Sequence, residues 1–292
     1  MKTVNELIAE KISDISIRKR LAAEDRTIAV YKAHPELEDI DNKLLDLRKE
    51  KMLAAVEHDD KPIPAMEVRE KELLSLREDY VDSHGIDPHF DEEKPRCKKC
   101  GDTGYTVTPG DIRIVCPDCM TDVLKEAYEE AGMADYATYT LKSFALDHFG
   151  KKKDRRVKFE AVKKLFEADD AGKDPIAVYS DIPRSGKTFL AVILVKYAII
   201  EAKSAMYLKT EQLESFSDYK ISELKDCNFA VIDDYSAEAV MNRKIASSLN
   251  SVLEARIARS LPTLIVSSVP YDLLIKDSDA RIAGKLVNAV RI

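Results

Sequence analysis

The chain has 292 residues, of which 45% are hydrophobic and 34% charged, and its formal net charge is −7. This length predicts two domains. The negative net charge argues against a protein whose whole surface is basic and binds DNA, although a local basic patch is compatible with this charge. Because no apolar run reaches about 18 residues and the N-terminus lacks the apolar core of a signal peptide, we predict a cytoplasmic protein without membrane contact.

Residues 1 to 90 are polar and have the apolar spacing of helices. The apolar positions recur at steps of three and four residues: Val4, Ile8, Ile12 and Ile15 in the first predicted helix, Leu37, Ile40, Leu44 and Leu47 in the second, and Leu73, Leu76 and Tyr80 in the third. This pattern is typical of a small helical bundle or an antiparallel hairpin with solvated charged faces. A narrow apolar stripe is also suited to docking on a partner protein, and the two interpretations are compatible.

The next region, 91–135, contains four of the five cysteines. Two C-x2-C pairs, Cys97 with Cys100 and Cys116 with Cys119, are separated by fifteen residues, which lies within the range of zinc ribbons. The turn-rich "GDTGY" and "TPGD" between them predict a hairpin. Four thiolates complete a tetrahedral Zn²⁺ site without an open position, so we predict a structural role. Two disulfides are the alternative, which a reducing compartment disfavours. Cys227 is predicted to be a small buried residue.

From about residue 151 to 292, strands and helices alternate. The apolar runs "PIAVYS", "SAMYLKT", "CNFAVIDD" and "PTLIVSS" predict four buried strands. Helices are predicted from Lys187 to about Ala202 and from about Asn242 to Ser260. This alternation predicts an α/β domain in which a parallel sheet lies between helices. The predicted organisation is a helical region (1–90), a zinc-binding module (91–135), a linker (136–150) and an α/β nucleotide-binding domain (151–292).

The segment "SDIPRSGKTFLA" follows the first of these strands and opens a helix, which is the context that a phosphate-binding loop requires. Backbone N–H groups at a helix N-terminus favour phosphate, Lys187 would reach the β- and γ-phosphates, and Thr188 would hold Mg²⁺ through its hydroxyl. Asp233, at the end of "VIDD", would hold the same ion, and Asp234 would orient the attacking water. The predicted nucleotide-binding residues are Pro183, Arg184, Ser185, Gly186, Lys187, Thr188, Phe189 and Asp233.

Several of these motifs resemble those of a known protein family. The chain resembles the bacterial replicative helicase loaders of the DnaC/DnaI type, which are AAA+ ATPases related to the transposition ATPase IstB. The resemblance covers nearly the whole chain and is carried by "CKKCGDTGY", "SGKTFLA", "VIDDYSAE" and "RIARSLPTLIV". It implies an N-terminal region that binds the hexameric replicative helicase. It also implies an AAA+ domain that binds ATP or ADP with Mg²⁺, contacts single-stranded DNA and helps to deliver the helicase ring onto DNA.

Four features depart from the family pattern. Asp181 replaces the first glycine of the loop, where its β-carbon restricts the backbone and its charge lies near the phosphates. Ser268 stands where the family has an asparagine that positions water. In "RIAGKL", Arg281 is followed by Lys285, where the family has an arginine finger for a neighbour's nucleotide, and lysine lacks the planar fork. The chain also ends at Ile292, before the family's last strand and its terminal arginine sensor.

These departures predict slow hydrolysis or none, in a weak or degenerate AAA+ ATPase such as a phage or mobile element would encode. Nucleotide binding is expected to persist, because the loop lysine, the threonine and the acidic residue at the strand end persist. Self-assembly would depend on the helicase as a template. Two alternatives stay open: an adaptor or inhibitor that binds the helicase without hydrolysis, and an unrelated P-loop enzyme such as a small-molecule kinase. The basic run 151–158, with Lys163 and Lys164, suits either a DNA-facing stripe or a solvated linker.

Overall fold

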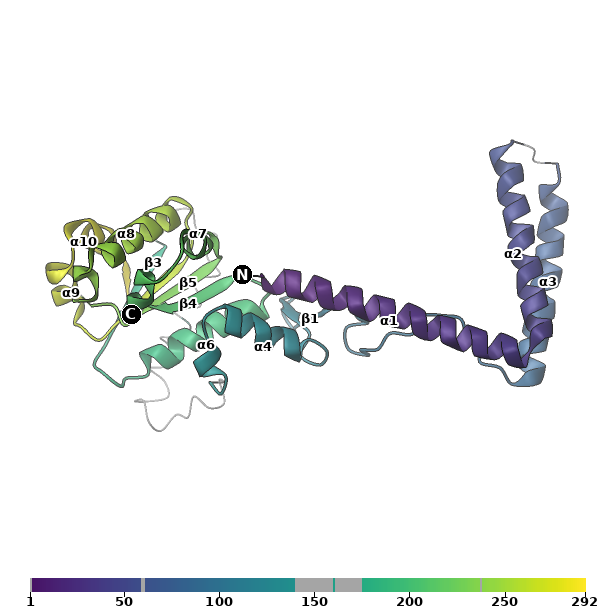
Figure 1. Ribbon diagram of the computed structural model, residues 1–292, viewed down its shortest axis with the longest axis horizontal. Helices are drawn as coiled ribbons and strands as arrows, with labels where there is room; N and C mark the ends of the chain where they lie inside the picture. Colours follow the sequence, from purple (N-terminus) through teal and green to yellow (C-terminus); the bar gives the residue numbers. More distant parts are fainter. Residues whose placement is uncertain (1, 59–60, 140–159, 161–174, 237) are drawn as a thin grey trace. The chain divides into compact units, whose positions relative to one another are not determined.

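The computed structural model describes residues 2–58, 61–139, 160, 175–236 and 238–292 (Figure 1). The chain divides into two compact units, one formed by Ile12–Asp102 and the other by Met1–Lys11 with Thr103–Ile292. The basic run 151–158 and Lys163 and Lys164 lie outside the described residues. Within the described ranges, no helix is both long enough and apolar enough to cross a membrane.

The smaller unit is helical, as predicted. It contains most of α1 (Val4–Ala33) and all of α2 (Pro35–Val56) and α3 (Ile63–His84), and α2 and α3 pair as an antiparallel hairpin (Figure 1). Pro35 lies in the first turn of α2, where its missing N–H breaks no helical bond. Most of the predicted apolar positions face the seam between helices: Leu37, Ile40, Leu44 and Leu73 are buried.

One predicted position in α3 is wrong. Leu76 was expected beside Leu73, but its side chain is 52% exposed. Arg77 takes the inward position instead, where its guanidinium Nε donates to the Asp41 carboxylate over 2.7 Å. An arginine whose guanidinium bonds to a carboxylate can cover apolar surface with its aliphatic stem, so Arg77 can occupy the inward position at this turn of α3.

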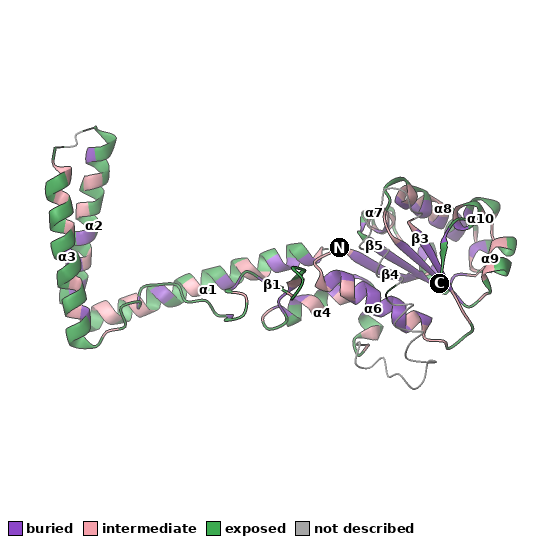
Figure 2. Cartoon of the chain, turned by 180° about the vertical axis from the view of Figure 1, so that it is seen from behind, coloured by how far each residue is buried: buried purple, intermediate pink, exposed green. Residues whose placement is uncertain are grey.

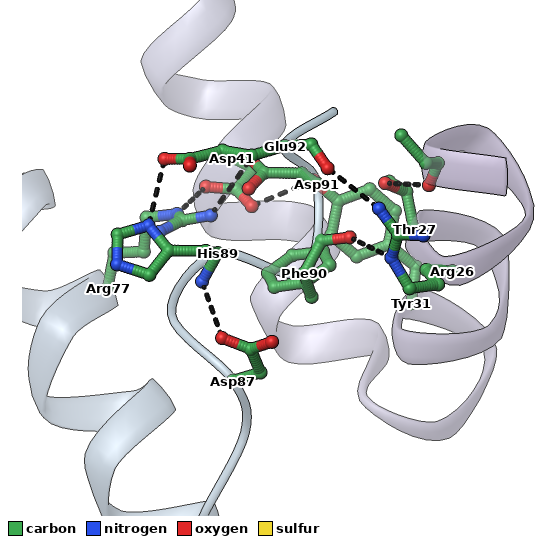
Figure 3. A network of polar contacts seen from close by, with 11 residues as sticks. Arg26, Thr27, Tyr31, Asp41, Arg77, Asp87, His89, Phe90, Asp91 and Glu92 are labelled. Carbon is green, nitrogen blue, oxygen red and sulfur yellow. Dashed lines mark hydrogen bonds and ion pairs between the residues drawn. The ribbon is translucent and has the colours of Figure 1, made fainter. Parts of the chain in front are cut away.

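A polar network joins the end of α1, the first half of α2, α3 and the loop after α3 (Figure 3). Asp41 receives hydrogen bonds from both Arg77 and the Tyr31 hydroxyl, the latter at 2.8 Å. The Arg77 guanidinium also pairs with Asp91 and lies 5.5 Å from the centre of the Phe90 ring. Burial, followed by the hydrogen bond to Asp41, raises the pKa of the Tyr31 hydroxyl. Helices α1, α2 and α3 and the loop after α3 are therefore joined by one half-buried arginine–carboxylate pair.

Replacing Arg77 with alanine is expected to lower the free energy of unfolding of the helical unit by about 2 kcal/mol, because the change leaves the partly buried Asp41 carboxylate with one partner fewer. The control is Arg69→Ala, since the Arg69–Glu72 pair is exposed on both sides and its loss should cost at most about 0.5 kcal/mol. Urea unfolding followed by far-ultraviolet circular dichroism measures both. Equal effects of the two variants would contradict the prediction.

The larger unit is built on a five-stranded parallel sheet whose strand order is β4-β5-β6-β3-β7. Its strands are β3 (Ile176–Ser180), β4 (Ala205–Lys209), β5 (Phe229–Asp233), β6 (Thr263–Ser267) and β7 (Val290–Arg291). Such a sheet, with helices on both faces, is typical of the AAA+ fold and confirms the predicted fold class. Because the strands are parallel, the loop after β3 and the acidic end of β5 lie at the same edge of the sheet.

The fifth strand corrects a prediction. We expected the sheet to lack its last strand, but Val290 and Arg291 pair in parallel with Ala177 and Val178, and the Ile292 N–H donates to the Val178 carbonyl. The two-residue strand has too little apolar periodicity to be recognised in the sequence. Among the described strands, β3 is therefore paired on both sides, by β6 and by β7.

Helices cover both faces of the sheet (Figures 1 and 2). On one face, α8 (Arg243–Ala258) packs Leu249, Val252 and Leu253 against alternate strand residues, and α7 (Asp218–Asp226), α9 (Tyr271–Asp277) and α10 (Ala280–Leu286) flank it. On the other face lies α6 (Lys187–Ile200), which is buried along nearly its whole length. A helix that is apolar all round is suited to this position, and it fixes the loop from which it begins.

The cysteine region forms the predicted hairpin. Strands β1 (Tyr105–Val107) and β2 (Arg113–Val115) pair antiparallel, and α4 (Thr121–Glu130) follows. Arg113 stacks on the Tyr105 ring at 3.6 Å, and the Tyr105 hydroxyl donates to Asn5. After α4, the short helix η1 (Ala134–Tyr136) packs on the sheet unit. Of the predicted linker 136–150, residues 140–150 lie outside the described part of the chain.

Candidate nucleotide site and cysteine cluster

The second half of the loop between β3 and α6 contains two residues in the left-handed backbone conformation. Gly186 has φ +87° and precedes the first residue of α6, and Arg184 also has a positive φ of 65°. Among the described residues with positive φ, Asp181 does not occur. The backbone conflict predicted for this substitution is therefore absent, and only its charge remains to oppose phosphate. The Asp181 carboxylate accepts the N–H of Ile182 at 2.8 Å.

Lys187 is buried inside this loop. Its ammonium Nζ donates to the carbonyl oxygens of Asp181 at 2.8 Å and Ile182 at 2.7 Å, and lies 3.3 Å from the Ser185 hydroxyl. These oxygens are neutral, so a phosphate oxygen would compete with them for the ammonium through a stronger, charge-assisted bond. The loop therefore holds the lysine next to the helix N-terminus, where anions are favoured.

Thr188 and Asp233, which we predicted to share Mg²⁺, lie close enough for hydrogen bonding from Thr188 to lower the pKa of the Asp233 carboxyl. Asp233 is 1% exposed and accepts further bonds from the Tyr207 hydroxyl at 2.8 Å and from the Asp234 N–H at 2.8 Å. Burial raises the pKa of the Asp233 carboxyl, and the bonds from Thr188 and Tyr207 act in the opposite direction. A hydroxyl and a carboxylate are ligands suited to Mg²⁺, which would neutralise charge on the β- and γ-phosphates.

Asp234 lies outside this cluster. It has φ +53°, and its exposed carboxylate is 3.5 Å from the Lys209 ammonium at the end of β4. Asp234 accordingly raises the pKa of Lys209 above its ordinary value. The role of Asp234 in orienting water stays a prediction. To take this role, the Asp234 carboxylate would have to leave its ion pair with Lys209.

Ser268 follows β6 and lines a cavity of about 400 Å³ together with the first half of the loop, Asp181, Ile182 and Pro183. Its exposed hydroxyl therefore lies on the loop side of the sheet, where a water-positioning group is expected. The Phe189 side chain is buried, and its ring stacks on that of Tyr139 with centroids 4.5 Å apart.

The two predicted trans-acting residues lie on α10. The Lys285 ammonium donates to the Asn250 side chain of α8 at 2.8 Å, and the Arg281 guanidinium pairs with Asp279 at 3.2 Å. No described contact joins either residue to the loop within this chain. Their action on a neighbouring subunit stays a prediction.

The four clustered cysteines lie together, as predicted. The sulfur atoms of Cys97, Cys100, Cys116 and Cys119 are all within 4.8 Å of one another. No disulfide joins any two of the five cysteines, all of which lie in the described part of the chain. Four thiolates around Zn²⁺ have sulfur–sulfur distances of about 3.8 Å, so this donor set could form a zinc-binding module.

The first cysteine knuckle is held by Asp102. Its carboxylate accepts the N–H groups of Arg96 and Cys97, the latter at 2.8 Å, and pairs with Lys19. Although burial opposes ionisation, these bonds hold the pKa of Asp102 below its ordinary value. The fifth cysteine behaves as predicted: Cys227 is buried, and this burial raises the pKa of its thiol.

Sequence reasoning missed three residues around the site. Tyr207 donates to Asp233, Lys209 pairs with Asp234, and Lys196 is a buried lysine in the middle of α6. Lys196 had a signal, because a single charge inside a run as apolar as "FLAVILVKYAII" needs a compensating partner. The other two depend on β4 lying beside β5, which strand patterns alone do not reveal.

No protein-family model matches this sequence, and a search of curated proteins likewise yields no match. Among solved structures, the chain is similar to AMPPCP-bound DnaA from Aquifex aeolicus, with 14% identity and a TM-score of 0.45 over 53% of this chain and 50% of DnaA. A DnaI crystal structure aligns with 19% identity and a TM-score of 0.41 over 48% of this chain and 84% of DnaI.

Domain III of the replication initiation protein DnaA from Thermotoga maritima aligns with 13% identity and a TM-score of 0.41, over 50% of this chain and 64% of that one. The structural neighbours thus include a DnaI protein and DnaA proteins, and this chain spans about half the length of the Aquifex DnaA chain. Because all three TM-scores lie below 0.5, the functional proposal rests on the residues of the chain itself.

Proposed function

We propose that this chain is a cytoplasmic DNA replication helicase loader whose AAA+ domain binds ATP or ADP with Mg²⁺ and uses the nucleotide as a switch. The observation that carries nucleotide binding is the meeting of Thr188 with the buried carboxylate of Asp233, beside the loop that holds Lys187. These are the groups that Mg²⁺ and the β- and γ-phosphates require, at the edge of the parallel sheet where such ligands bind.

The helical region, 1–90, is the part we propose to bind the hexameric replicative helicase, and the sheet unit would contact single-stranded DNA. This assignment rests on the sequence resemblance. The helical unit supports it by exposing large apolar side chains along α2, including Leu45, Met52 and Val56. We propose Zn²⁺ as the structural ion of the four-cysteine cluster, with all four positions filled by protein thiolates.

We propose that hydrolysis is slow. The carboxylate of Asp181 adds negative charge beside the phosphates, and Asp234 pairs with Lys209, so it is not free to orient water. Arg281 and Lys285 on α10 would act on the nucleotide of a neighbouring copy of the chain, when several copies assemble on the helicase. If binding occurs without any turnover, the same features favour the alternative of a non-hydrolysing adaptor or inhibitor of the helicase.

Lys187→Ala is expected to weaken Mg·ADP binding about a hundredfold, because it removes the ammonium from two phosphate oxygens at about 1.5 kcal/mol each. Calorimetry measures the affinity, and ATP turnover is assayed with and without the helicase and single-stranded DNA. The control is Lys244→Ala, an exposed lysine on α8 at the opposite face of the sheet, which should bind like the natural chain. Absence of nucleotide binding by the natural chain at millimolar concentration would sink the proposal.

A further inference from the structure

Asp233 is linked to a second tyrosine that lies far away in the sequence. The Tyr207 hydroxyl donates to Asp233 Oδ2, so its single proton is used there. The Tyr136 hydroxyl lies 3.1 Å from the Tyr207 hydroxyl, and with that proton engaged it must be the donor. The two rings meet edge to face, with centroids 5.2 Å apart. A directed chain of hydrogen bonds therefore runs from Tyr136 through Tyr207 to the acid.

The backbone beside Tyr207 is fastened to the end of α4. Strand β4 lies at an edge of the sheet, and its Tyr207 N–H donates to the carbonyl of Ala131 at 2.8 Å. The next residue, Gly132, has φ +86°, and a β-carbon there would lie 2.3 Å from the Tyr207 carbonyl oxygen. The chain after α4 thus approaches β4 at the same residue whose side chain reaches Asp233.

The segment Ala131–Tyr139 is held on its other side by α6. The buried ammonium of Lys196 donates to the carbonyls of Tyr136, Ala137 and Tyr139, at 2.7 to 3.1 Å. Burial lowers the pKa of Lys196. The Tyr139 ring stacks on Phe189, which directly follows Thr188. The segment therefore contacts α6, which supplies the proposed Mg²⁺ ligand Thr188, and β4, whose Tyr207 bonds to the second proposed ligand, Asp233 at the end of β5.

We propose that Tyr207 is a positioning residue for the Asp233 carboxylate, with Tyr136 as the second link, so that Mg²⁺ binding at this site is coupled to the segment Ala131–Tyr139. The proposal rests on the proposed nucleotide function. Tyr207 donates to Oδ2 and the Asp234 N–H donates to Oδ1, so the two bonds together fix the orientation of the carboxylate that we propose to bind the ion. Helix α4 begins two residues after Cys119, so the coupled segment lies between the cysteine cluster and the nucleotide site in the chain.

The test compares the affinity of the full chain for ADP with Mg²⁺ and with EDTA, for the natural protein, Tyr207→Phe, Tyr136→Phe and Tyr128→Phe. Each change removes one hydroxyl and keeps the ring. Tyr128 is the matched control, since it is a half-buried tyrosine of α4 whose ring lies near the Lys196 ammonium and outside the hydrogen-bond chain. The readout is the ratio of the affinity for ADP with Mg²⁺ to the affinity for ADP with EDTA. A general loss of stability lowers both affinities together and leaves this ratio unchanged.

Tyr207→Phe is expected to lower the Mg²⁺-dependent gain in affinity about tenfold, the equivalent of one hydrogen bond to a charged group, and Tyr136→Phe about threefold. The affinity in EDTA should change by less than about twofold in either, and Tyr128→Phe should leave the ratio unchanged. If the natural chain binds Mg·ADP and both tyrosine variants keep its ratio, the positioning role is overturned while the proposed function stands.

If the natural chain binds no nucleotide, the proposed function and the positioning role fall together. If Tyr207→Phe does not fold, as judged by its thermal unfolding, Tyr136→Phe decides the question alone: a reduced ratio supports the chain of hydrogen bonds, and an unchanged ratio overturns it. A reduced ratio in Tyr128→Phe as well would also overturn it, because the effect would then belong to packing around α4.

Discussion

Cys116→Ser is expected to abolish zinc binding and to unfold the hairpin β1–β2. A structural zinc site contributes about 10–16 kcal/mol in small domains, and a hairpin of two three-residue strands has almost no apolar core of its own. Cys116 is fully buried, and its N–H closes the hairpin by donating to the Gly104 carbonyl. Loss of one of four thiolates therefore removes both the ion and the main source of stability of this module.

The measurement is metal analysis of purified protein, with limited proteolysis to detect opening of the hairpin. The natural chain should carry about one zinc per molecule and the Cys116→Ser variant almost none. Cys227→Ser is the matched control, because Cys227 is also buried but bonds to the carbonyls of Leu224 and Phe229, away from the cluster. A natural chain without zinc, or a Cys116→Ser variant that retains it, would contradict the zinc assignment.

The sequence was most informative where function depends on residues close together in the chain. The two C-x2-C pairs predict their own cluster, since each knuckle is local and the hairpin between them brings the pairs together. The loop and the acidic end of β5 were also predictable, because the carboxyl ends of parallel strands share one edge. Neither conclusion required knowledge of which strands are neighbours.

What the sequence could not reveal depends on contacts between distant segments. Tyr136 and Tyr207 are separated by 71 residues, and their meeting depends on β4 being an edge strand against which the end of α4 packs. The inward turn of Arg77 in place of Leu76 has the same origin, because the partner carboxylate of Asp41 lies on another helix. In both cases tertiary context overrides a local pattern.

Gly132→Ala is expected to lower the free energy of unfolding of the sheet unit by about 4 kcal/mol. A left-handed residue other than glycine costs about 1–2 kcal/mol, and overpacking adds about 1–3 kcal/mol. The overpacking is specific here, because the new β-carbon would lie 2.3 Å from the backbone oxygen of Tyr207, which cannot rotate away. The change should also weaken Mg·ADP binding, since it separates the end of α4 from β4 beside Asp233.

Gly85→Ala separates the two contributions. Gly85 and Gly132 both end a helix in the left-handed conformation, and each is followed by an N–H that bonds back to the carbonyl five residues earlier, from Ile86 to Val81 and from Met133 to Tyr128. A β-carbon on Gly85 meets nothing within 4 Å, so this variant should cost the helical unit only the conformational part, about 1–2 kcal/mol. Urea unfolding of both variants gives the comparison. A Gly132→Ala cost no larger than that of Gly85→Ala would mean that the end of α4 is free to move away from β4, and the link from this segment to the nucleotide site would lose its backbone support.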